Sequence, residues 1–295
     1  MDQFTTSGYY QCKYQRAQVR SLIIFFLFLI SSTIGLAQNG PDIPTIDPGL
    51  WQTQQLAPGL TWKYRHFDTL FHSRQSINIL DVDPDYPLNI EVAHLDSGLE
   101  KTSLIGQQRK ALAAVNGTYF NMKKGGSVCL LMADSRIISL PDSGLSAQHG
   151  NGAITIDQAR KASIIPRPEE GWKTMKDFQD VMSSGPLLLL NGSYTKLVED
   201  KFNQNRHPRT AVGITQDGHV LFVTADGRNA QAAGLSTPEL AMIMKSLGCR
   251  DALNLDGGGS TSMWTARNGV VNFPSDNKRF DHEGERKVAN ALIIR

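Results

Sequence analysis

Cysteine is scarce in this chain of 295 residues, which contains only three. No two of them have the short spacing of a zinc site, so the sequence does not indicate a thiolate metal centre. Cys12 lies near the N-terminus, whereas Cys129 and Cys249 stand among apolar residues. An oxidising compartment would let these two pair, but their apolar neighbours favour buried free thiols.

A surplus of charge is also missing. The chain holds 30 basic and 28 acidic residues, and without residues 1–37, which carry three basic and one acidic side chain, 27 of each remain. Nucleic-acid binding usually requires a basic face on a clearly positive domain. We therefore expect no nucleic-acid partner.

Long apolar runs are missing except at Leu22–Ile30, which basic residues precede and Gly35-Leu36-Ala37 follows. This order is typical of a secretory signal peptide. The run is about ten residues long and falls short of the ~20 that span a bilayer. The sequence thus predicts a signal peptide over residues 1–37 with cleavage near Ala37. A secreted or periplasmic protein with no stable membrane anchor after cleavage follows from this prediction.

Short alternating segments predict strands over much of residues 59–295, after an irregular leader at 38–58. The first three strands, at 61–67, 76–83 and 88–95, are joined by short connections that favour antiparallel pairing. Helices are expected at 102–109 and 236–247, and residues 157–180 have the composition of a loop. The fold class that follows is α+β: a single strand-rich mixed domain with a central sheet and a few packed helices.

Glycine is concentrated in one late stretch, Asp256-Gly257-Gly258-Gly259-Ser260-Thr261. A simple turn needs one or two glycines. Three of them between a carboxylate and hydroxyl residues leave backbone N–H groups open to a ligand oxygen, so this stretch predicts a functional site. The apolar segment 252–255 before it is typical of a buried strand, and open sheets often bind ligands where strands end.

A second group of candidates flanks the predicted hairpin 211–214 with 219–224. His207 and Arg209 precede its first strand, and Asp226-Gly227-Arg228 follows its second. Antiparallel pairing would bring the two arginines together, and paired guanidinium groups suit a phosphate or carboxylate. Surface ion pairs, including one with Asp226, are the alternative.

Taken in order, these motifs resemble the phosphodiester glycosidase family, and the resemblance covers roughly residues 105–295. The matching motifs are Val115-Asn116-Gly117-Thr118-Tyr119-Phe120-Asn121, Ser184-Gly185-Pro186, Arg206-His207-Pro208-Arg209-Thr210-Ala211, Asp226-Gly227-Arg228, the segment 234–261 and Val288-Ala289-Asn290-Ala291. One departure is Thr118, where many members carry a second glycine.

The resemblance implies hydrolysis of the C1–O bond of a sugar-1-phosphodiester, such as an α-N-acetylglucosamine-1-phosphodiester or a related glycan, to sugar and phosphomonoester. Such a reaction has an oxocarbenium-like transition state and needs a carboxylate near C1. Asp256 is the first catalytic candidate and Asp226 the second. The candidates for binding the substrate and its phosphate are Arg209, Arg228, His207, Gly257, Gly258, Gly259, Ser260 and Thr261, and those for orienting sugar hydroxyls are Asn116 and Asn290.

Two other functions stay open. A metal-dependent phosphodiesterase would cleave the P–O bond, and Asp226, Asp256 and His207 could supply ligands for a divalent metal, although the sequence requires no cofactor. A non-catalytic carbohydrate-binding protein of the cell envelope would bind glycans without turnover. Neither a P-loop lysine nor a Gly-x-Ser-x-Gly nucleophile elbow is present.

Overall fold

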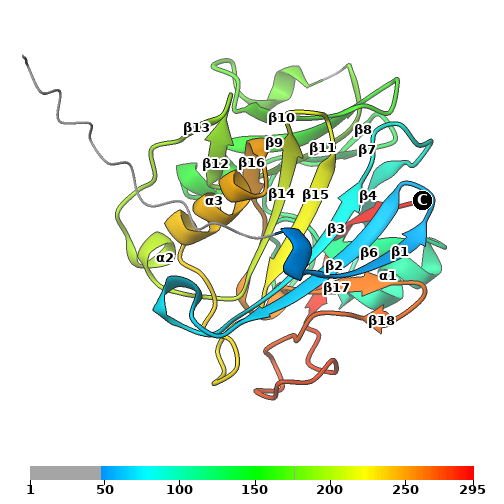
Figure 1. The fold of residues 1–295 in the computed structure, drawn as a ribbon. Coiled ribbons are helices and arrows are strands. Elements are labelled where there is room, and N and C mark those ends of the chain that lie inside the picture. The colour runs from blue at the N-terminus through cyan, green and yellow to red at the C-terminus, as the bar shows by residue number, and fades with distance from the viewer. Residues whose placement is uncertain (1–47, 176) are drawn as a thin grey trace, which may run out of the picture. The chain divides into compact units, whose positions relative to one another are not determined.

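The structure is a computed structural model that describes residues 48–175 and 177–295 (Figure 1). The predicted signal peptide at 1–37 and the first part of the predicted leader lie outside these residues. Within the described ranges, no helix has the length and apolar character needed to cross a membrane.

The largest sheet has eight strands, and each neighbouring pair is antiparallel. In spatial order they are β1 (Gln52–Ala57), β2 (Leu60–Phe67), β3 (Gln75–Val82), β15 (Val220–Ala225), β14 (Arg209–Thr215), β16 (Cys249–Asn254), β12 (Leu187–Leu190) and β13 (Ser193–Tyr194). The hairpin predicted for 211–214 with 219–224, which turns at Asp217-Gly218, is confirmed as β14 and β15.

Two five-stranded sheets and one two-stranded sheet complete the strands of the described residues. Their orders are β10 (Ala162–Pro166), β9 (Gly152–Asp157), β11 (Phe178–Ser184), β7 (Leu131–Ala133) and β8 (Arg136–Ser139); β18 (Gly269–Val270), β17 (Met263–Thr265), β6 (Ala113–Asn116), β20 (Asn290–Ile294) and β4 (Ile90–His94); and β19 (Lys287–Val288) with β5 (Glu100–Lys101). Leu80, Val115, Ile154 and Leu253 meet in one apolar core, so the three larger sheets pack together. The strand-rich prediction is confirmed, and the strands divide among several sheets.

Helices are short and few in the described part of the chain. They are α1 (Thr102–Gln108), α2 (Lys201–Gln204) and α3 (Thr237–Ser246), with 3-10 turns at Pro48–Leu50, Leu70–His72, Ala147–Gly150, Trp172–Thr174 and Gly258–Ser260. The predicted α3 begins with a capping box, in which the side chains of Ser236 and Glu239 each accept from the other's backbone N–H. Its buried face, including Leu240 and Met244, packs on the eight-stranded sheet (Figure 1).

Three segments differ from the sequence prediction. Residues 52–57 belong to β1 and not to an irregular leader, because backbone pairing with β2 orders this polar segment. β4 does not continue the sheet beside β3; after a proline-containing connection it pairs with β20 in another sheet. Within the expected loop 157–180, residues 162–166 form β10, which folds back on β9. Each of these segments is ordered by backbone hydrogen bonds to a partner that local sequence does not reveal.

Cys129 and Cys249 are both buried and free, as their apolar neighbours predicted. Burial raises the pKa of each thiol to about 12, so neither is a reactive thiolate at neutral pH.

Candidate active site

Three strands of the eight-stranded sheet place predicted site residues at one end of that sheet. Arg209 begins β14, Asp226 directly follows β15, and Asp256 closely follows β16. The register pairs Arg209 with Ala225, and Ala211 with Asn254. Because neighbouring antiparallel strands begin and end side by side, the sheet brings Arg209, Asp226 and Asp256 to the same end.

The three glycines after Asp256 are required by close neighbours. A Cβ atom at Gly257 would lie 2.8 Å from the Pro208 carbonyl oxygen, and one at Gly258 would lie 2.9 Å from Nη2 of Arg228. At Gly259 it would collide with the side chains of Asp276 and Arg286. Gly258 also has a φ of +63°, which favours glycine. The glycines therefore let other segments approach the Asp256 loop closely.

Four backbone amides of this loop, which were expected to be open to an anion, have acceptors within the protein. Gly258 N–H donates to the Pro208 carbonyl at 2.8 Å, and Gly257 N–H donates to Oδ1 of Asp256 at 2.9 Å. The N–H groups of Ser260 and Thr261 close the 3-10 turn by donating to Gly257 and Gly258, each at 3.2 Å. These donors are already used within the protein, so they do not converge on an external oxygen.

The Asp256 carboxyl group has a strongly perturbed pKa. Burial raises this pKa to about 6, while the Ser260 hydroxyl, the Gly257 N–H and the charge of Arg286 oppose the rise. A residue with such a pKa is ionised at neutral pH in a site that disfavours its charge. Perturbed carboxylates of this kind are typical of reactive sites.

Asn116 fixes the backbone on which Asp256 stands. Its Nδ2 donates to the Asp256 carbonyl at 2.7 Å, and its Oδ1 accepts from the Thr210 hydroxyl at 2.7 Å and from Ser262 N–H at 3.1 Å. In return, Asp256 N–H donates to the Gly117 carbonyl at 3.0 Å. Asn116 is fully buried, so its amide holds the loop and does not face solvent.

Asn290 packs against the segment 116–118, which adjoins the Asp256 loop. Its Oδ1 accepts from Thr118 N–H at 2.7 Å, and a side chain at Gly117 would collide with that oxygen. Nδ2 of Asn290 has no hydrogen-bond partner within the described residues. The side chain is 1% exposed, so it supports the 116–118 segment from inside the fold.

Asp226 is enclosed more completely than Asp256. Its side chain is 0% exposed, and it accepts hydrogen bonds from the Ser76 hydroxyl at 2.7 Å, Asn272 Nδ2 at 2.9 Å and Phe273 N–H at 2.8 Å. Burial raises its pKa to about 6 against these three donors. The geometry makes Asp226 an anchor between β3 and the loop that follows β18, and it leaves the carboxylate closed to a substrate.

Arg209 is also held inside the protein. Its guanidinium donates to the carbonyls of Leu235, Phe202 and Asn205 at 3.0, 2.6 and 3.2 Å, and it lies 4.8 Å from the Phe202 ring centroid. Burial lowers its pKa to about 10, and the charge of Arg228 acts in the same direction. Arg209 remains cationic at neutral pH and supplies positive charge from within the site.

Arg228 is exposed and differs from Arg209 in having no ion pair or hydrogen bond to another described residue through its side chain. Its φ of +65° is uncommon for a residue with a side chain, and its guanidinium lies against Gly258. His207 lies near both arginines, and burial together with their charges lowers its pKa. An accessible cation and a neutral imidazole thus flank the Asp256 loop.

Within the described ranges, no three side chains from His, Cys, Asp and Glu gather closely enough to hold a metal ion. His207, Asp226 and Asp256 accordingly do not form the metal cluster considered from the sequence.

Residues 109–295 match the model of the phosphodiester glycosidase family, which is well over half of the chain. The chain belongs to the phosphodiester glycosidase family. The match includes Asn116, Arg209, Arg228 and the Asp256 loop.

Two curated proteins are similar to parts of this chain. The mouse N-acetylglucosamine-1-phosphodiester alpha-N-acetylglucosaminidase is 27% identical over 180 residues, covering 55% of this chain and 33% of the mouse protein. The SPbeta prophage-derived protein YomE of Bacillus subtilis is 39% identical over 90 residues, covering 30% of this chain and 13% of that protein. The matches therefore span only a third or less of these relatives.

The fold is shared with a solved member of the family. The catalytic domain of the zebrafish N-acetylglucosamine-1-phosphodiester alpha-N-acetylglucosaminidase superposes with a TM-score of 0.65 at 21% identity, covering 83% of this chain and 88% of that one. At this identity the likeness concerns the fold alone.

An aromatic cluster contacts Arg209 and Asn254 and was not predicted as part of the candidate site. Tyr119 lies 4.7 Å from the His149 ring, which lies 4.6 Å from the Phe202 ring. The Tyr119 hydroxyl donates to the Gly185 carbonyl at 2.6 Å, and burial and then the charge of Asp256 raise its pKa well above the ordinary value. Tyr119 belongs to the 115–121 motif, so the sequence offered a signal for this residue. His149 and Phe202 lie in segments that carry no family motif.

Arg286 is the other residue that sequence reasoning missed. It donates twice to Asp276, at 2.8 Å from Nε and from Nη2, and this pair packs against Gly259. Its charge lowers the pKa of Asp256. The polar segment 272–286 carries no motif, so its position beside the glycine loop had no signal in the sequence.

Proposed function

We propose that this chain is an exported hydrolase that cleaves the C1–O bond of a sugar-1-phosphodiester and releases the sugar and a phosphomonoester. The observation that carries the proposal is the juxtaposition of Asp256, a carboxylate with a pKa of about 6, and Arg228, an unpaired guanidinium against Gly258. A sugar-1-phosphodiester needs an anionic protein group near its anomeric carbon and a cationic group near its phosphate.

Asp256 supplies the negative charge at the anomeric carbon. As the C1–O bond breaks, positive charge develops on the sugar ring, and a carboxylate in a site that hydrates it poorly interacts strongly with that charge. The phosphomonoester leaves as a stable anion and needs little protonation. One catalytic carboxylate is therefore sufficient, and Asp226 acts as a positioning residue for the loop at Asn272 and Phe273.

Arg228 binds the phosphate, and Arg209 adds charge from behind it. An exposed guanidinium can donate two parallel hydrogen bonds to phosphate oxygens. His207, neutral at pH 7 because its pKa is lowered, donates or accepts one hydrogen bond beside it. Asn116 and Asn290 position the backbone at Asp256 and Thr118 instead of binding sugar hydroxyls.

The sugar proposed is α-N-acetylglucosamine or a related glycan unit, supported by the names of the mouse and zebrafish relatives. Export rests on the signal-peptide pattern within residues 1–37. Glycan phosphodiesters of an envelope polymer would be within reach of an exported enzyme.

The reaction is tested in oxygen-18 water with the methyl phosphodiester of α-N-acetylglucosamine 1-phosphate. Attack at C1 puts the label on the sugar and leaves methyl phosphate unlabelled, whereas attack at phosphorus labels the phosphate. Mass spectrometry of methyl phosphate is the decisive measurement, because phosphate oxygens do not exchange with water on this time scale. Labelled methyl phosphate, or labelled N-acetylglucosamine 1-phosphate formed with release of methanol, would overturn the proposal, and a parallel reaction with a chelator reports dependence on a metal.

The acid limb of the pH profile should follow Asp256. We expect kcat/KM to be constant above about pH 6 and to fall about tenfold for each unit below it, because the carboxylate must be ionised and its pKa is about 6. Arg286→Gln should move this limb to higher pH, since it removes a positive charge that favours the ionised form. A profile measured from pH 4.5 to 8.5 that stays flat, or a limb that Arg286→Gln leaves in place, contradicts the assignment.

Arg228→Ala should weaken the use of phosphodiesters without loss of stability. We expect kcat/KM to fall about 10²-fold, because a charge-assisted bidentate contact is lost, and Arg228→Lys to recover only part of it. The matched control is Arg136→Ala, which removes an exposed arginine from β8 in a different sheet. Equal kinetics for Arg228→Ala and Arg136→Ala would show that Arg228 does not bind the phosphate.

A further inference from the structure

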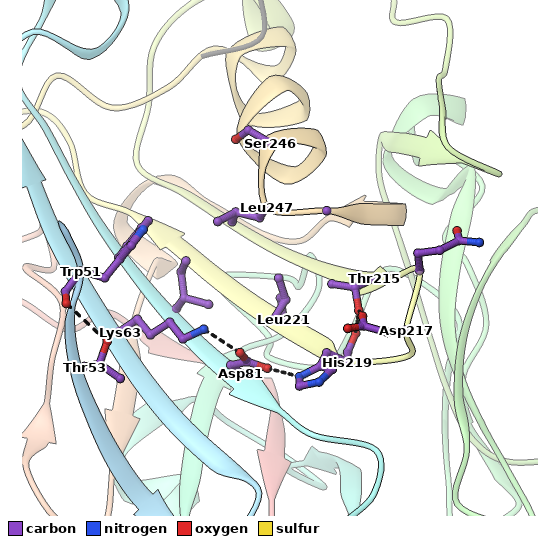
Figure 2. A pocket seen from close by; sticks show the side chains of 13 residues that line it. Trp51, Thr53, Lys63, Asp81, Thr215, Asp217, His219, Leu221, Ser246 and Leu247 are labelled. Atoms are coloured by element: carbon purple, nitrogen blue, oxygen red, sulfur yellow. Dashed lines mark hydrogen bonds and ion pairs between the residues drawn. The ribbon is translucent and has the colours of Figure 1, made fainter. Parts of the chain in front are cut away.

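A hollow lies at the end of the eight-stranded sheet opposite the candidate active site, on the face that α3 partly covers (Figure 2). Its volume is about 710 Å³, within the ~300–1,000 Å³ range of small-molecule sites. β1, β2, β3 and β15 form its floor, and the end of α3 at Ser246 and Leu247 forms its upper wall. None of the predicted site residues lines it.

A row of three charged or ionisable side chains crosses the floor. Lys63 Nζ lies 2.8 Å from Oδ2 of Asp81, and Nδ1 of His219 lies 2.7 Å from Oδ1 of the same carboxylate. Figure 2 shows Lys63, Asp81 and His219 in this order, with Leu221 beside them. Burial alone would lower the pKa of His219, but the hydrogen bond and charge of Asp81 outweigh it and raise that pKa.

This row retains hydrogen-bonding capacity. Within the described residues, Nε2 of His219 has no partner, and Lys63 uses only one of its three N–H donors. The Asp81 oxygens accept one bond each and have further lone pairs. Lys63 and His219 are about a third exposed, so a ligand in the hollow can reach them.

Trp51 forms one side wall, opposite Thr215 and Asp217 (Figure 2). The indole packs edge-on against Phe67, with ring centroids 5.9 Å apart, which fixes its orientation. Ile79 and Leu221 add apolar floor between the polar groups. An aromatic wall beside ordered donors and an acceptor presents both an apolar surface and a polar edge.

We propose that this hollow is a saccharide-binding site, separate from the active site, that takes an uncharged sugar unit of a glycan. The ring C–H groups of a sugar would lie against Trp51, and its hydroxyls would bind to Lys63, Asp81 and His219. Asp81 lies between Lys63 and His219, and Asp217 is a second acidic residue in the lining, so the two acidic groups balance the two basic ones and no net charge selects an anionic ligand. The cavity and the mixture of apolar and polar surfaces match a neutral sugar better than an apolar or phosphorylated molecule.

Saccharide binding in the hollow would assist the proposed hydrolysis. β14 runs from Arg209 at the active-site end to Thr215 at the hollow and spans about 20 Å at ~3.4 Å per residue. A glycan polymer held at the far end would raise the local concentration of its phosphodiesters near Asp256. Binding itself does not depend on the proposed hydrolysis.

The test uses Asp256→Asn protein, titrated with chitotetraose, cellotetraose and maltotetraose by calorimetry. We expect at least one of these neutral tetrasaccharides to bind with a Kd in the micromolar to millimolar range. Adding Trp51→Ala or Asp81→Asn should weaken that binding about tenfold or more, through loss of aromatic packing or of the polar row. Asp81→Asn preserves side-chain shape and keeps the test valid where Trp51→Ala impairs folding.

The matched control is Tyr194→Ala, which removes an exposed aromatic residue from β13, outside the hollow. Tyr194→Ala should leave saccharide affinity unchanged, and Trp51→Ala should leave affinity for the methyl phosphodiester unchanged. The proposal is overturned by an absence of binding up to about 10 mM for all three sugars. It is equally overturned by saccharide affinities that Trp51→Ala and Asp81→Asn do not alter.

Discussion

Asp256→Asn is expected to lower kcat for the sugar-1-phosphodiester by about 10³-fold or more while substrate still binds. The substitution keeps the size of the side chain and removes its negative charge, which matters most when positive charge develops at C1. Each factor of ten corresponds to about 1.4 kcal/mol of transition-state stabilisation, so the expected loss is about 4 kcal/mol or more. Single-turnover kinetics and calorimetric titration with the methyl phosphodiester separate chemistry from binding.

Asp180→Asn is the matched control for this experiment. Asp180 is also buried and has a raised pKa caused chiefly by burial, but it accepts from Val92 N–H and Asp134 N–H in the sheet of β11. Its replacement should change kcat by only a few fold. Turnover by Asp256→Asn at more than a tenth of the wild-type rate, with folded protein, would refute the role given to Asp256. If the chain were a non-catalytic carbohydrate-binding protein, neither the wild type nor Asp256→Asn would show turnover.

The sequence predicted best those elements whose signals are local. The helix α3 was recognisable because Ser236, Pro238 and Glu239 specify its start and apolar residues recur at helical spacing. The β14–β15 hairpin was recognisable from Asp217-Gly218 between two alternating segments. Both elements carry or position the candidate site, which explains why its location at the end of β16 was predictable.

Pairing between distant segments was not predictable in the same way. β4 has the same alternating pattern as β2 and β3, yet it joins β20 and β6 in another sheet. β1 is too polar to be recognised by hydrophobic periodicity and depends on its backbone bonds to β2. A single sequence records the pattern of each strand but not the identity of its partner.

Contacts between distant segments also change the roles of several residues within the site. Amides of a glycine-rich stretch were expected to bind an anion, but Pro208, a residue distant in sequence, already accepts from Gly258. Asn116 and Asp226 have the chemistry of ligand-binding residues, and burial turns them into supports for the neighbouring loops. Residue type gives the available chemistry, whereas exposure and existing partners decide whether a substrate can use it.

Asp226→Ala should destabilise the protein by about 2–4 kcal/mol, because it leaves three buried donors without an acceptor. These donors are the Ser76 hydroxyl, the Asn272 amide and the Phe273 N–H. Urea unfolding followed by tryptophan fluorescence measures the change. A loss below about 0.5 kcal/mol would show that the anchor does not hold this loop in solution.

Asp226→Asn distinguishes positioning from catalysis at the second carboxylate. An asparagine oxygen can still accept from Asn272 and Phe273, and the Ser76 hydroxyl can turn to accept from the new amide, so the fold should persist. If Asp226 acts only by position, kcat should stay within about tenfold of wild type, whereas Asp256→Asn loses about 10³-fold. Folded Asp226→Asn protein with the same kinetic defect as Asp256→Asn would instead make Asp226 the carboxylate of the reaction, because only the loss of its charge would then explain the loss of rate.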